Sequence, residues 1–259
     1  MGGPISLLRR ETSSRATPVV LIHGVNGAAG QWLDVMALLA DRPVLAVDLR
    51  GHGDSAQASG YGADAYAADV TAVLDHVGFP EVHLVGTSFG GGVAVTVAAQ
   101  RPAQVRSVAI IGGALTVAGT ADIDLIVGEL RRLGPTAFFE LIAASSFAPG
   151  TDETLIRDSV ALAARRDADT IEHILRDAFT ADVSEAAARV TAKALVLTGE
   201  HDQTCPPELG AALAHALGAR PEILPGRGHM AHVEDPALIA QRIDSHLADV
   251  ETHESIAGG

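Results

Sequence analysis

Cysteine, aromatic residues and positive charge are all scarce in this sequence of 259 residues. The single cysteine, Cys205, excludes a disulfide within the chain, which is typical of a protein from a reducing compartment. Aromatic residues make up only 3% of the chain, whereas hydrophobic residues make up 47%. A core must therefore be built mainly from small and branched aliphatic side chains.

Lysine and arginine together number 18, against 32 aspartates and glutamates, so the formal net charge is −14. An acidic surface repels phosphate backbones and anionic lipid, so we expect neither a nucleic acid nor a membrane as a partner. Residues 1–15 contain no sustained apolar stretch. We expect no signal peptide or membrane span there, and we place the protein in the cytoplasm.

Metal and cofactor motifs are also missing. No group of cysteines and histidines has the spacing of a zinc site. The run Gly90-Gly91-Gly92 is not followed by the lysine and Ser/Thr pair of a phosphate-binding loop. We therefore expect no metal and no cofactor, and the sequence leaves the oligomeric state open.

Short apolar runs alternate with helical patterns along most of the chain. The apolar runs cover residues 18–22, 43–47, 82–85, 105–111, 194–197 and, more weakly, 222–224. Helical patterns cover 31–41, 63–77, 89–100, 206–217 and 235–247. Continuous apolar runs fit strands that are buried on both faces. The alternation predicts an α/β fold with a doubly wound, mostly parallel sheet.

The alternation stops between residues 115 and 188, where no strand is evident. Four helical patterns follow one another there, at 122–133, 136–145, 151–165 and 169–179. We expect a helical insertion at 115–188 between two segments of one core, 1–114 and 189–250. The polar end, 251–259, is expected to be a flexible tail.

A serine flanked by glycines separates the apolar run 82–85 from the helical pattern 89–100. Ser88 lies in Gly86-Thr87-Ser88-Phe89-Gly90. A sharp turn between strand and helix strains the backbone at such a serine, and the neighbouring glycines relieve the crowding. The pattern alone also fits a glycine-rich helix start capped by serine. The strand-turn-helix setting favours the other interpretation, in which Ser88 is a nucleophile at the carboxyl edge of the sheet.

A serine nucleophile needs a base, and the base needs an acid. His229 lies in a glycine-rich loop after the last apolar run, at the same predicted sheet edge as Ser88, so we predict it as the base. His232, three residues on, is its rival. Asp202 follows the run 194–197 and is predicted to be the acid, with Glu200 as a neighbouring alternative.

An oxyanion hole requires two backbone donors. We expect the first to be the N–H of Phe89, next to Ser88. We assign the second to the N–H of Val25, because the segment His23-Gly24-Val25-Asn26-Gly27 follows an apolar run and can bring backbone close to a ligand. An ordinary strand-to-helix turn is the alternative for this segment.

The sequence resembles the α/β-hydrolase superfamily over nearly its whole length. The HGxxG loop at His23, the segment from Asp48 to Ser55, the turn at Ser88, and the GEHD and GRGH loops occur in the family's order. The resemblance implies that the insertion is a cap over the active site, and that Asp48 and His52 shape loops. A serine nucleophile separates this chain from epoxide hydrolases and haloalkane dehalogenases, which need an aspartate there.

These residues predict a serine hydrolase that cleaves a small or medium carboxylic ester or lactone through an acyl-enzyme. The substrate is expected to lie between the turn and the cap, against aromatic side chains at Trp32, Phe89, Phe138, Phe139 and Phe147. Packing between a helix and the sheet is an equal alternative for Trp32. Arg131 and Arg132 are either solvated cap residues or a site for a substrate carboxylate, as an enol-lactonase-like role requires.

Two further hypotheses remain open on the sequence. Similar caps and triads serve hydrolysis of a C–C bond in diketones, and cofactor-free perhydrolysis. A hydrolase-like protein that binds a ligand without turnover is the hypothesis of another class.

Overall fold

A central sheet organises the computed structural model, which describes residues 3–257, with the side chains of 3–252. Seven strands of this part of the chain pair in the order β1-β3-β2-β4-β5-β6-β7. They are β1 (Leu7–Arg10), β2 (Val19–Ile22), β3 (Val44–Val47), β4 (Val82–Thr87), β5 (Val105–Ile111), β6 (Lys193–Gly199) and β7 (Pro221–Leu224). β1 runs antiparallel to β3, and the other pairings are parallel. The predicted α/β fold with a mostly parallel sheet is confirmed.

The strand β1 has no counterpart among the apolar runs of the sequence. Its four residues, Leu7–Arg10, carry two leucines and two arginines, and three of the four are only half-buried. β1 pairs with β3 at the edge of the sheet. An edge strand need not be apolar on both faces, so the pattern of a buried strand is missing from its sequence.

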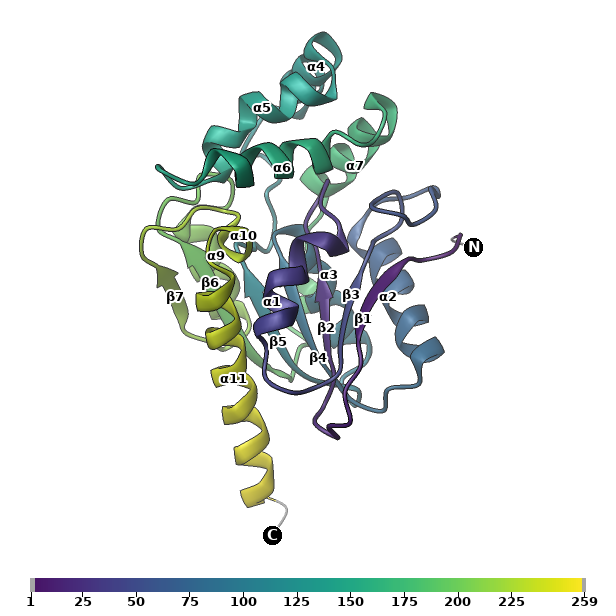
Figure 1. The fold of residues 1–259 in the computed structure, drawn as a ribbon, viewed down its shortest axis with the longest axis vertical. Helices are drawn as coiled ribbons and strands as arrows, with labels where there is room; N and C mark the ends of the chain where they lie inside the picture. The colour runs from purple at the N-terminus through teal and green to yellow at the C-terminus, as the bar shows by residue number, and fades with distance from the viewer. Residues whose placement is uncertain (1–2, 258–259) are drawn as a thin grey trace.

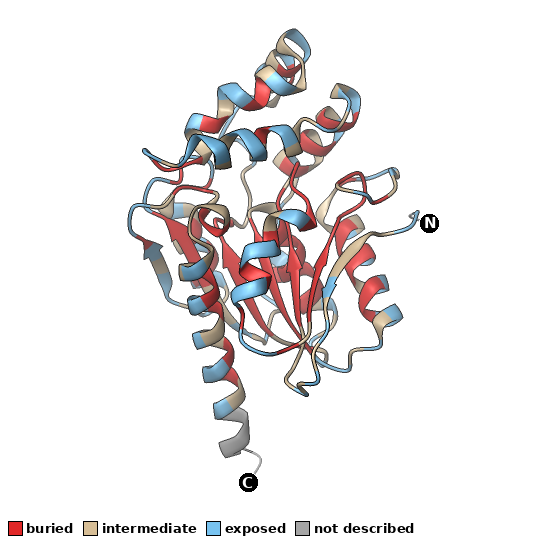
Figure 2. Cartoon of the chain, in the orientation of Figure 1, coloured by how far each residue is buried: buried red, intermediate tan, exposed pale blue. Residues whose placement is uncertain are grey.

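Helices cover both faces of the sheet (Figure 1). On one face, α1 (Leu33–Leu38) and α11 (Pro236–Ala257) pack with η1 (Ala29–Trp32) and α10 (Ala231–Glu234). On the other face lie α2 (Ala63–Val77), α3 (Phe89–Gln100) and α9 (Pro207–Ala216). The central strands are buried throughout (Figure 2), because side chains of alternate residues pack against the helices of opposite faces.

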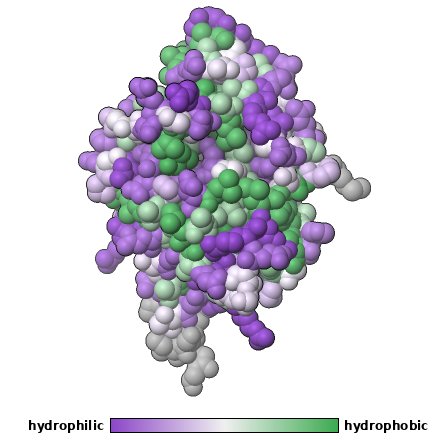
Figure 3. Space-filling view, in the orientation of Figure 1, coloured by the Kyte–Doolittle hydropathy of each residue, from purple (hydrophilic) through white to green (hydrophobic). Residues whose placement is uncertain are grey.

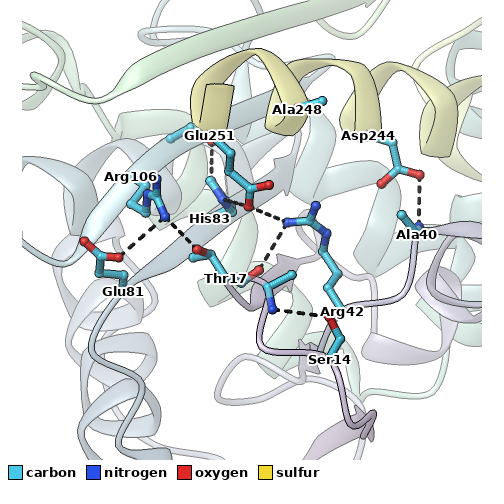
Figure 4. Close-up of polar contacts among 12 residues, drawn as sticks. Ser14, Thr17, Ala40, Arg42, Glu81, His83, Arg106, Asp244, Ala248 and Glu251 are labelled. Atoms are coloured by element: carbon cyan, nitrogen blue, oxygen red, sulfur yellow. Dashed lines mark hydrogen bonds and ion pairs between the residues drawn. The ribbon is translucent and has the colours of Figure 1, made fainter. Parts of the chain in front are cut away.

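The last helix, α11, extends beyond its predicted end at Leu247. It continues to Ala257, so residues 251–257 of the predicted flexible tail are helical, while Gly258 and Gly259 lie outside the described residues. Glu251 fixes this extension to the sheet (Figure 4). Its carboxylate accepts a hydrogen bond of 3.0 Å from Arg42 and lies 3.4 Å from the ring of the buried His83.

Five helices lie between β5 and β6 in the chain. They are α4 (Ile123–Leu133), α5 (Pro135–Ser146), α6 (Glu153–Ala163), α7 (Ala168–Thr180) and α8 (Ser184–Ala187). Figure 1 shows α4 to α7 together above the end of the sheet where the parallel strands terminate. We call α4 to α7 the cap. The boundaries 1–114, 115–188 and 189–250 that the sequence suggests for cap and core stay predictions.

The cap has its own apolar interior, in which Leu130, Phe138, Ile171 and Leu175 are buried. At its base, an antiparallel bridge joins Thr116 to Asp182. Polar contacts tie its far side to the core.

One such contact is the hydrogen bond of 2.7 Å from the Tyr61 amide of the core to the Asp177 carboxylate of α7.

Some apolar side chains on the surface of the core are not covered by other residues. Leu33 and Leu38 of α1 are exposed, and Figure 3 shows hydrophobic residues on the face of the core where α1 lies.

Candidate active site

Ser88 occupies a strained turn between β4 and α3. Its φ of 53° and ψ of −127° lie where residues with a side chain are rarely found. A Cβ at Gly86 would lie 2.2 Å from the Gly90 carbonyl oxygen, and a Cβ at Gly90 would lie 2.5 Å from the Ile22 carbonyl oxygen. The two glycines are therefore required by backbone packing. The Ser88 amide donates a 2.8 Å hydrogen bond to Ile111, which fixes the turn to β5.

His229 and Asp202 meet at the same edge of the sheet, in the loops after β7 and β6. His229 Nδ1 lies 2.8 Å from Asp202 Oδ2, and both residues are buried. The other oxygen, Asp202 Oδ1, accepts hydrogen bonds from the amides of Thr204 and Cys205, at 2.9 and 2.7 Å. These bonds fix the position of the carboxylate. Because the carboxylate contacts Nδ1 of His229, the other ring nitrogen, Nε2, is left for a second partner.

Gly112, at the end of β5, makes room for this pair. Its φ is +60°, and a Cβ there would lie 3.0 Å from both Asp202 Oδ2 and His229 Nδ1. Glycine is therefore favoured twice at this position, by its backbone conformation and by the space that the imidazole and carboxylate occupy.

Glu200, the alternative acid, and His232, the alternative base, both lie away from the cavity that contains Ser88. Glu200 is exposed and accepts a 2.8 Å hydrogen bond from the Gly226 amide. His232 is only 1% exposed, and its ring centroid is 4.7 Å from that of Trp32. Burial lowers the pKa of His232 to about 3, so this imidazole is neutral. Neither Glu200 nor His232 lines the cavity that contains Ser88.

Two backbone amides next to the serine in the chain or in space have no hydrogen-bond partner among the described residues. Phe89 begins α3, so its N–H is among the donors that a helix leaves free at its N-terminus. Val25 follows Gly24, where a Cβ would lie only 3.0 Å from the Cβ of Ser88. Within the part of the chain that the structure describes, neither the Val25 nor the Phe89 amide donates a hydrogen bond. They are the two amides that the sequence suggests for an oxyanion hole.

Two buried histidines shape the loop that carries Val25. His23 Nε2 accepts a 3.0 Å hydrogen bond from the Leu49 amide, and His52 Nε2 accepts one of the same length from Asn26. Burial lowers the pKa of His23 to about 4 and that of His52 to about 3, so both rings stay neutral and can accept.

Asp48 performs a similar task with its carboxylate. It accepts from the amide of Ala29 at 2.7 Å and from the amide of Asp54 at 3.1 Å. Asp48 and His52 are not among the residues that line the cavity, in agreement with the loop-shaping part that the family resemblance implies for them.

Ser88 and His229 line one cavity of about 630 Å³ between the sheet edge and the cap. Three of the predicted substrate contacts, Phe138, Phe139 and Phe147, also line it. The sequence does not single out the other apolar lining residues, which include Ile126, Ile142, Val160, Leu175, Phe179 and Met230. Helical periodicity marks such residues as buried, but it does not separate a cavity wall from the interior of the cap.

Trp32 corrects one sequence prediction. The sequence allows it as a cavity wall or as packing between helix and sheet, and the structure shows the second. The ring is fully buried among apolar residues on the α1 face of the sheet, including Val35 and Leu39. It does not line the cavity.

Phe89 also lies outside the large cavity but lines a smaller one beside Ser88, with a volume of about 90 Å³. Cys205 lines the same small pocket. Burial raises the pKa of the Cys205 thiol to about 12, so it is a protonated, unreactive filler, as the sequence suggests.

Arg131 and Arg132 do not reach the cavity. Arg131 pairs with Asp169 and Glu172 of α7, and Arg132 pairs with Glu129 on its own helix. Both are solvated cap residues. Among the described residues that line the large cavity there is no lysine or arginine, and the one acidic side chain is Glu208.

Two other kinds of site are absent from the described residues. No group of three or more histidines, cysteines, aspartates or glutamates among them is arranged to hold a metal ion. No helix in that part of the chain combines the length and the apolar character needed to cross a membrane.

A family model and a curated relative both match most of the chain. Residues 17–236 match a family model described as alpha/beta hydrolase fold. The chain is 31% identical to a 2-succinyl-6-hydroxy-2,4-cyclohexadiene-1-carboxylate synthase from Enterobacter sp. (strain 638), over 86% of this chain and 88% of that protein.

Two further likenesses are more limited in what they show. A dihydrolipoyllysine-residue acetyltransferase component of an acetoin cleaving system, from Pseudomonas putida, is 44% identical, over only 38% of this chain and 27% of that protein. The structure of an enol-lactonase from Burkholderia xenovorans LB400 superposes with a TM-score of 0.87 at 23% identity, covering 94% of this chain and 96% of that one. At this identity the superposition shows a shared fold.

Proposed function

The chain belongs to the alpha/beta hydrolase fold family, and from this premise we propose that it is a serine hydrolase of uncharged carboxylic esters or lactones. The observation that carries the proposal is the contact of 2.8 Å between His229 and the buried Asp202, together with the cavity that His229 and Ser88 both line. A serine and an imidazole that line one cavity, with a buried carboxylate bound to the imidazole, form the constellation for acyl transfer.

In the proposed mechanism, His229 Nε2 takes the proton of the Ser88 hydroxyl as Oγ attacks the substrate carbonyl. Asp202 holds the ring with Nδ1 protonated and stabilises the imidazolium that forms. The amides of Val25 and Phe89 donate to the oxyanion, because both are free to do so. Collapse of the intermediate breaks the bond to the leaving oxygen, which receives the proton from His229. A water then gives a proton to His229 and attacks the acyl carbon, and the bond to Ser88 Oγ breaks as this oxygen takes the proton from His229 and the acid is released.

The chemistry of the cavity walls supports an uncharged substrate. Its lining is mainly apolar, its described residues include no lysine or arginine, and Glu208 contributes a negative charge at an exposed position. A carboxylate transferred into such a cavity loses its hydration and finds no cation to pair with. The synthase relative is named for a carboxylate compound. The absence of a pairing cation here favours a neutral ester or lactone instead.

The first test is labelling with a fluorophosphonate probe, followed by intact mass. We expect one adduct on the native protein and none on Ser88→Ala. Asp202→Asn should label at least about a hundredfold more slowly, because the wrong His229 tautomer is then favoured. Circular dichroism and a thermal melt of each variant establish that it is folded.

The same experiment separates the alternatives. If the folded native protein binds an ester tightly but forms neither a probe adduct nor a hydrolysis product, it is a binding protein. If Ser88-dependent turnover is found, esters, lactones, diketones and hydrogen peroxide with a carboxylic acid are compared under one set of conditions. A dominant diketone or perhydrolase activity would replace the esterase proposal.

A further inference from the structure

We propose that Ser88 divides its substrate between two unequal compartments, with a short acyl group in the small pocket and a bulky apolar leaving group in the large cavity. This inference rests on the proposed serine mechanism and adds a substrate class to it: short-chain acyl esters of large, uncharged alcohols.

The two compartments meet at the serine. Both are lined by Ser88 and Val25, so a carbonyl attacked by Ser88 has access to each. They differ in the other catalytic groups. His229 lines only the large cavity, whereas Phe89, the second proposed oxyanion donor, lines only the small pocket.

Proton transfer decides which half of the ester occupies which compartment. When the tetrahedral intermediate collapses, the C–O bond to the leaving group breaks, and the leaving oxygen must take a proton from His229 Nε2. His229 Nδ1 is occupied by Asp202, so Nε2 is the nitrogen available toward the large cavity. The leaving oxygen and the carbon chain attached to it must therefore lie on that side. The acyl chain is left with the compartment beside Val25 and Phe89.

Volume then sets the length of each half. The small pocket measures about 90 Å³ and the large cavity about 630 Å³. Because an apolar cavity of roughly 150 Å³ holds one benzene ring, the small pocket has room for about three or four carbon atoms. An acetyl to butyryl group fits there, while the large cavity accepts an aromatic or branched alcohol.

The base of the cap forms the far wall of the small pocket. Leu115 and Val117 come from the segment after β5, and Ala178 and Val183 come from α7 and the segment that leaves it. The Val183 amide donates a 2.9 Å hydrogen bond to the Leu115 carbonyl, which holds the two segments together. The wall is therefore fixed in place, so acyl length should be limited sharply.

Pairs of isomeric esters provide the test. The two members of a pair have the same composition and nearly the same polarity, but one has a short acyl group with a large alcohol and the other a large acyl group with a short alcohol. We compare phenethyl acetate with ethyl phenylacetate, and hexyl acetate with ethyl hexanoate, and measure kcat/KM by acid release. The acetates should be hydrolysed at least about tenfold faster than their isomers, since each methylene that does not fit costs roughly that factor in a hydrophobic pocket.

Two variants locate the effect. Leu115→Ala enlarges the small pocket and should raise the rate on ethyl hexanoate relative to ethyl acetate. Ile142→Ala is the matched control, because Ile142 lines only the large cavity, and it should change the preference among acetates of different alcohols instead. Titration with the fluorophosphonate probe corrects each rate for the fraction of active enzyme.

The outcomes are distinct. Equal or faster hydrolysis of ethyl hexanoate and ethyl phenylacetate by the native enzyme would overturn the assignment of compartments and leave the serine mechanism intact. The same holds if Leu115→Ala alters alcohol preference and not acyl preference. No Ser88-dependent hydrolysis of any of the four esters would overturn the proposed function, and the compartments with it.

Discussion

The amide of Met230 donates a 3.1 Å hydrogen bond to the carbonyl of Ser146, so the residue after His229 is joined to the end of cap helix α5. Glu234 strengthens this joint. Its carboxylate accepts from the amide of Ala148, in the cap, at 3.1 Å and from the amide of Gly228, in the His229 loop, at 2.9 Å. The proposed base and the cap are therefore held by one set of polar contacts.

Glu234→Ala should uncouple the cap from the His229 loop. It removes both acceptors and leaves two amides unpaired, which costs about 2 kcal/mol for a half-buried carboxylate. We expect a lower melting temperature and a kcat reduced by about tenfold, with His229 less well placed. Glu234→Gln keeps one acceptor oxygen and should recover part of both losses. A melting temperature and kcat equal to those of the native protein would contradict the coupling.

Gly112→Ala should damage the His229–Asp202 pair directly. The added Cβ meets both side chains at 3.0 Å, and the φ of +60° adds strain of roughly 1 kcal/mol. We expect kcat/KM on phenethyl acetate to fall about a hundredfold. Gly119→Ala is the matched control, because Gly119 has a φ of +78° but no atom near the added Cβ. It should lose stability without the loss of rate, and equal rates for the two variants would refute the steric explanation.

Carboxylate-bearing esters should be poor substrates. Phenethyl acetate and its analogue with a carboxylate on the ring differ in charge at similar shape. We expect the anionic ester to have a kcat/KM lower by about tenfold or more, because its charge would be desolvated without a cation. Glu208→Lys places a cation at the cavity wall and should narrow the ratio between the two esters. An unchanged ratio in this variant would show that charge at this wall does not govern selectivity.

The folded protein should lose stability as the pH falls from about 6.5 toward 4. Burial lowers the pKa of His23 and His83 to about 4, and that of His52 and His232 to about 3. A depressed pKa in the folded state means that the unfolded chain binds these protons first, so the stability is present above pH 6.5 and lost below it. Near pH 5, unfolding should be accompanied by the uptake of roughly four protons from the solvent, about one by each of these rings.

Urea midpoints measured between pH 4 and 7 give this proton uptake. His83→Gln removes one of the titrating rings, which lies 2.8 Å from the Ser107 hydroxyl and 3.4 Å from the Glu251 carboxylate. This variant should reduce the uptake by about one proton. Midpoints that do not change over this pH range would contradict the assignment of these histidines as neutral in the folded state.

The sequence by itself determined the type of fold and the order of its chemistry. Apolar runs long enough to be buried on both faces specified the parallel strands, and glycines at 86 and 90 marked the turn at Ser88. Because parallel strands end at one edge, the order of strands and helices along the chain suffices to place the residues after β4, β6 and β7 together. Charge composition and motif spacing are likewise independent of packing.

Only the tertiary structure decided the questions that depend on packing between distant segments. Three findings are of this kind: β1 pairs with β3, Glu251 contacts Arg42, and Trp32 is buried against the sheet instead of lining the cavity. The cap shows the limit most clearly, since its helical periodicity predicts which residues turn inward but not whether they meet a neighbour or an empty volume. The two compartments at Ser88, and with them the proposed acyl length, exist only where the base of the cap crosses the sheet edge.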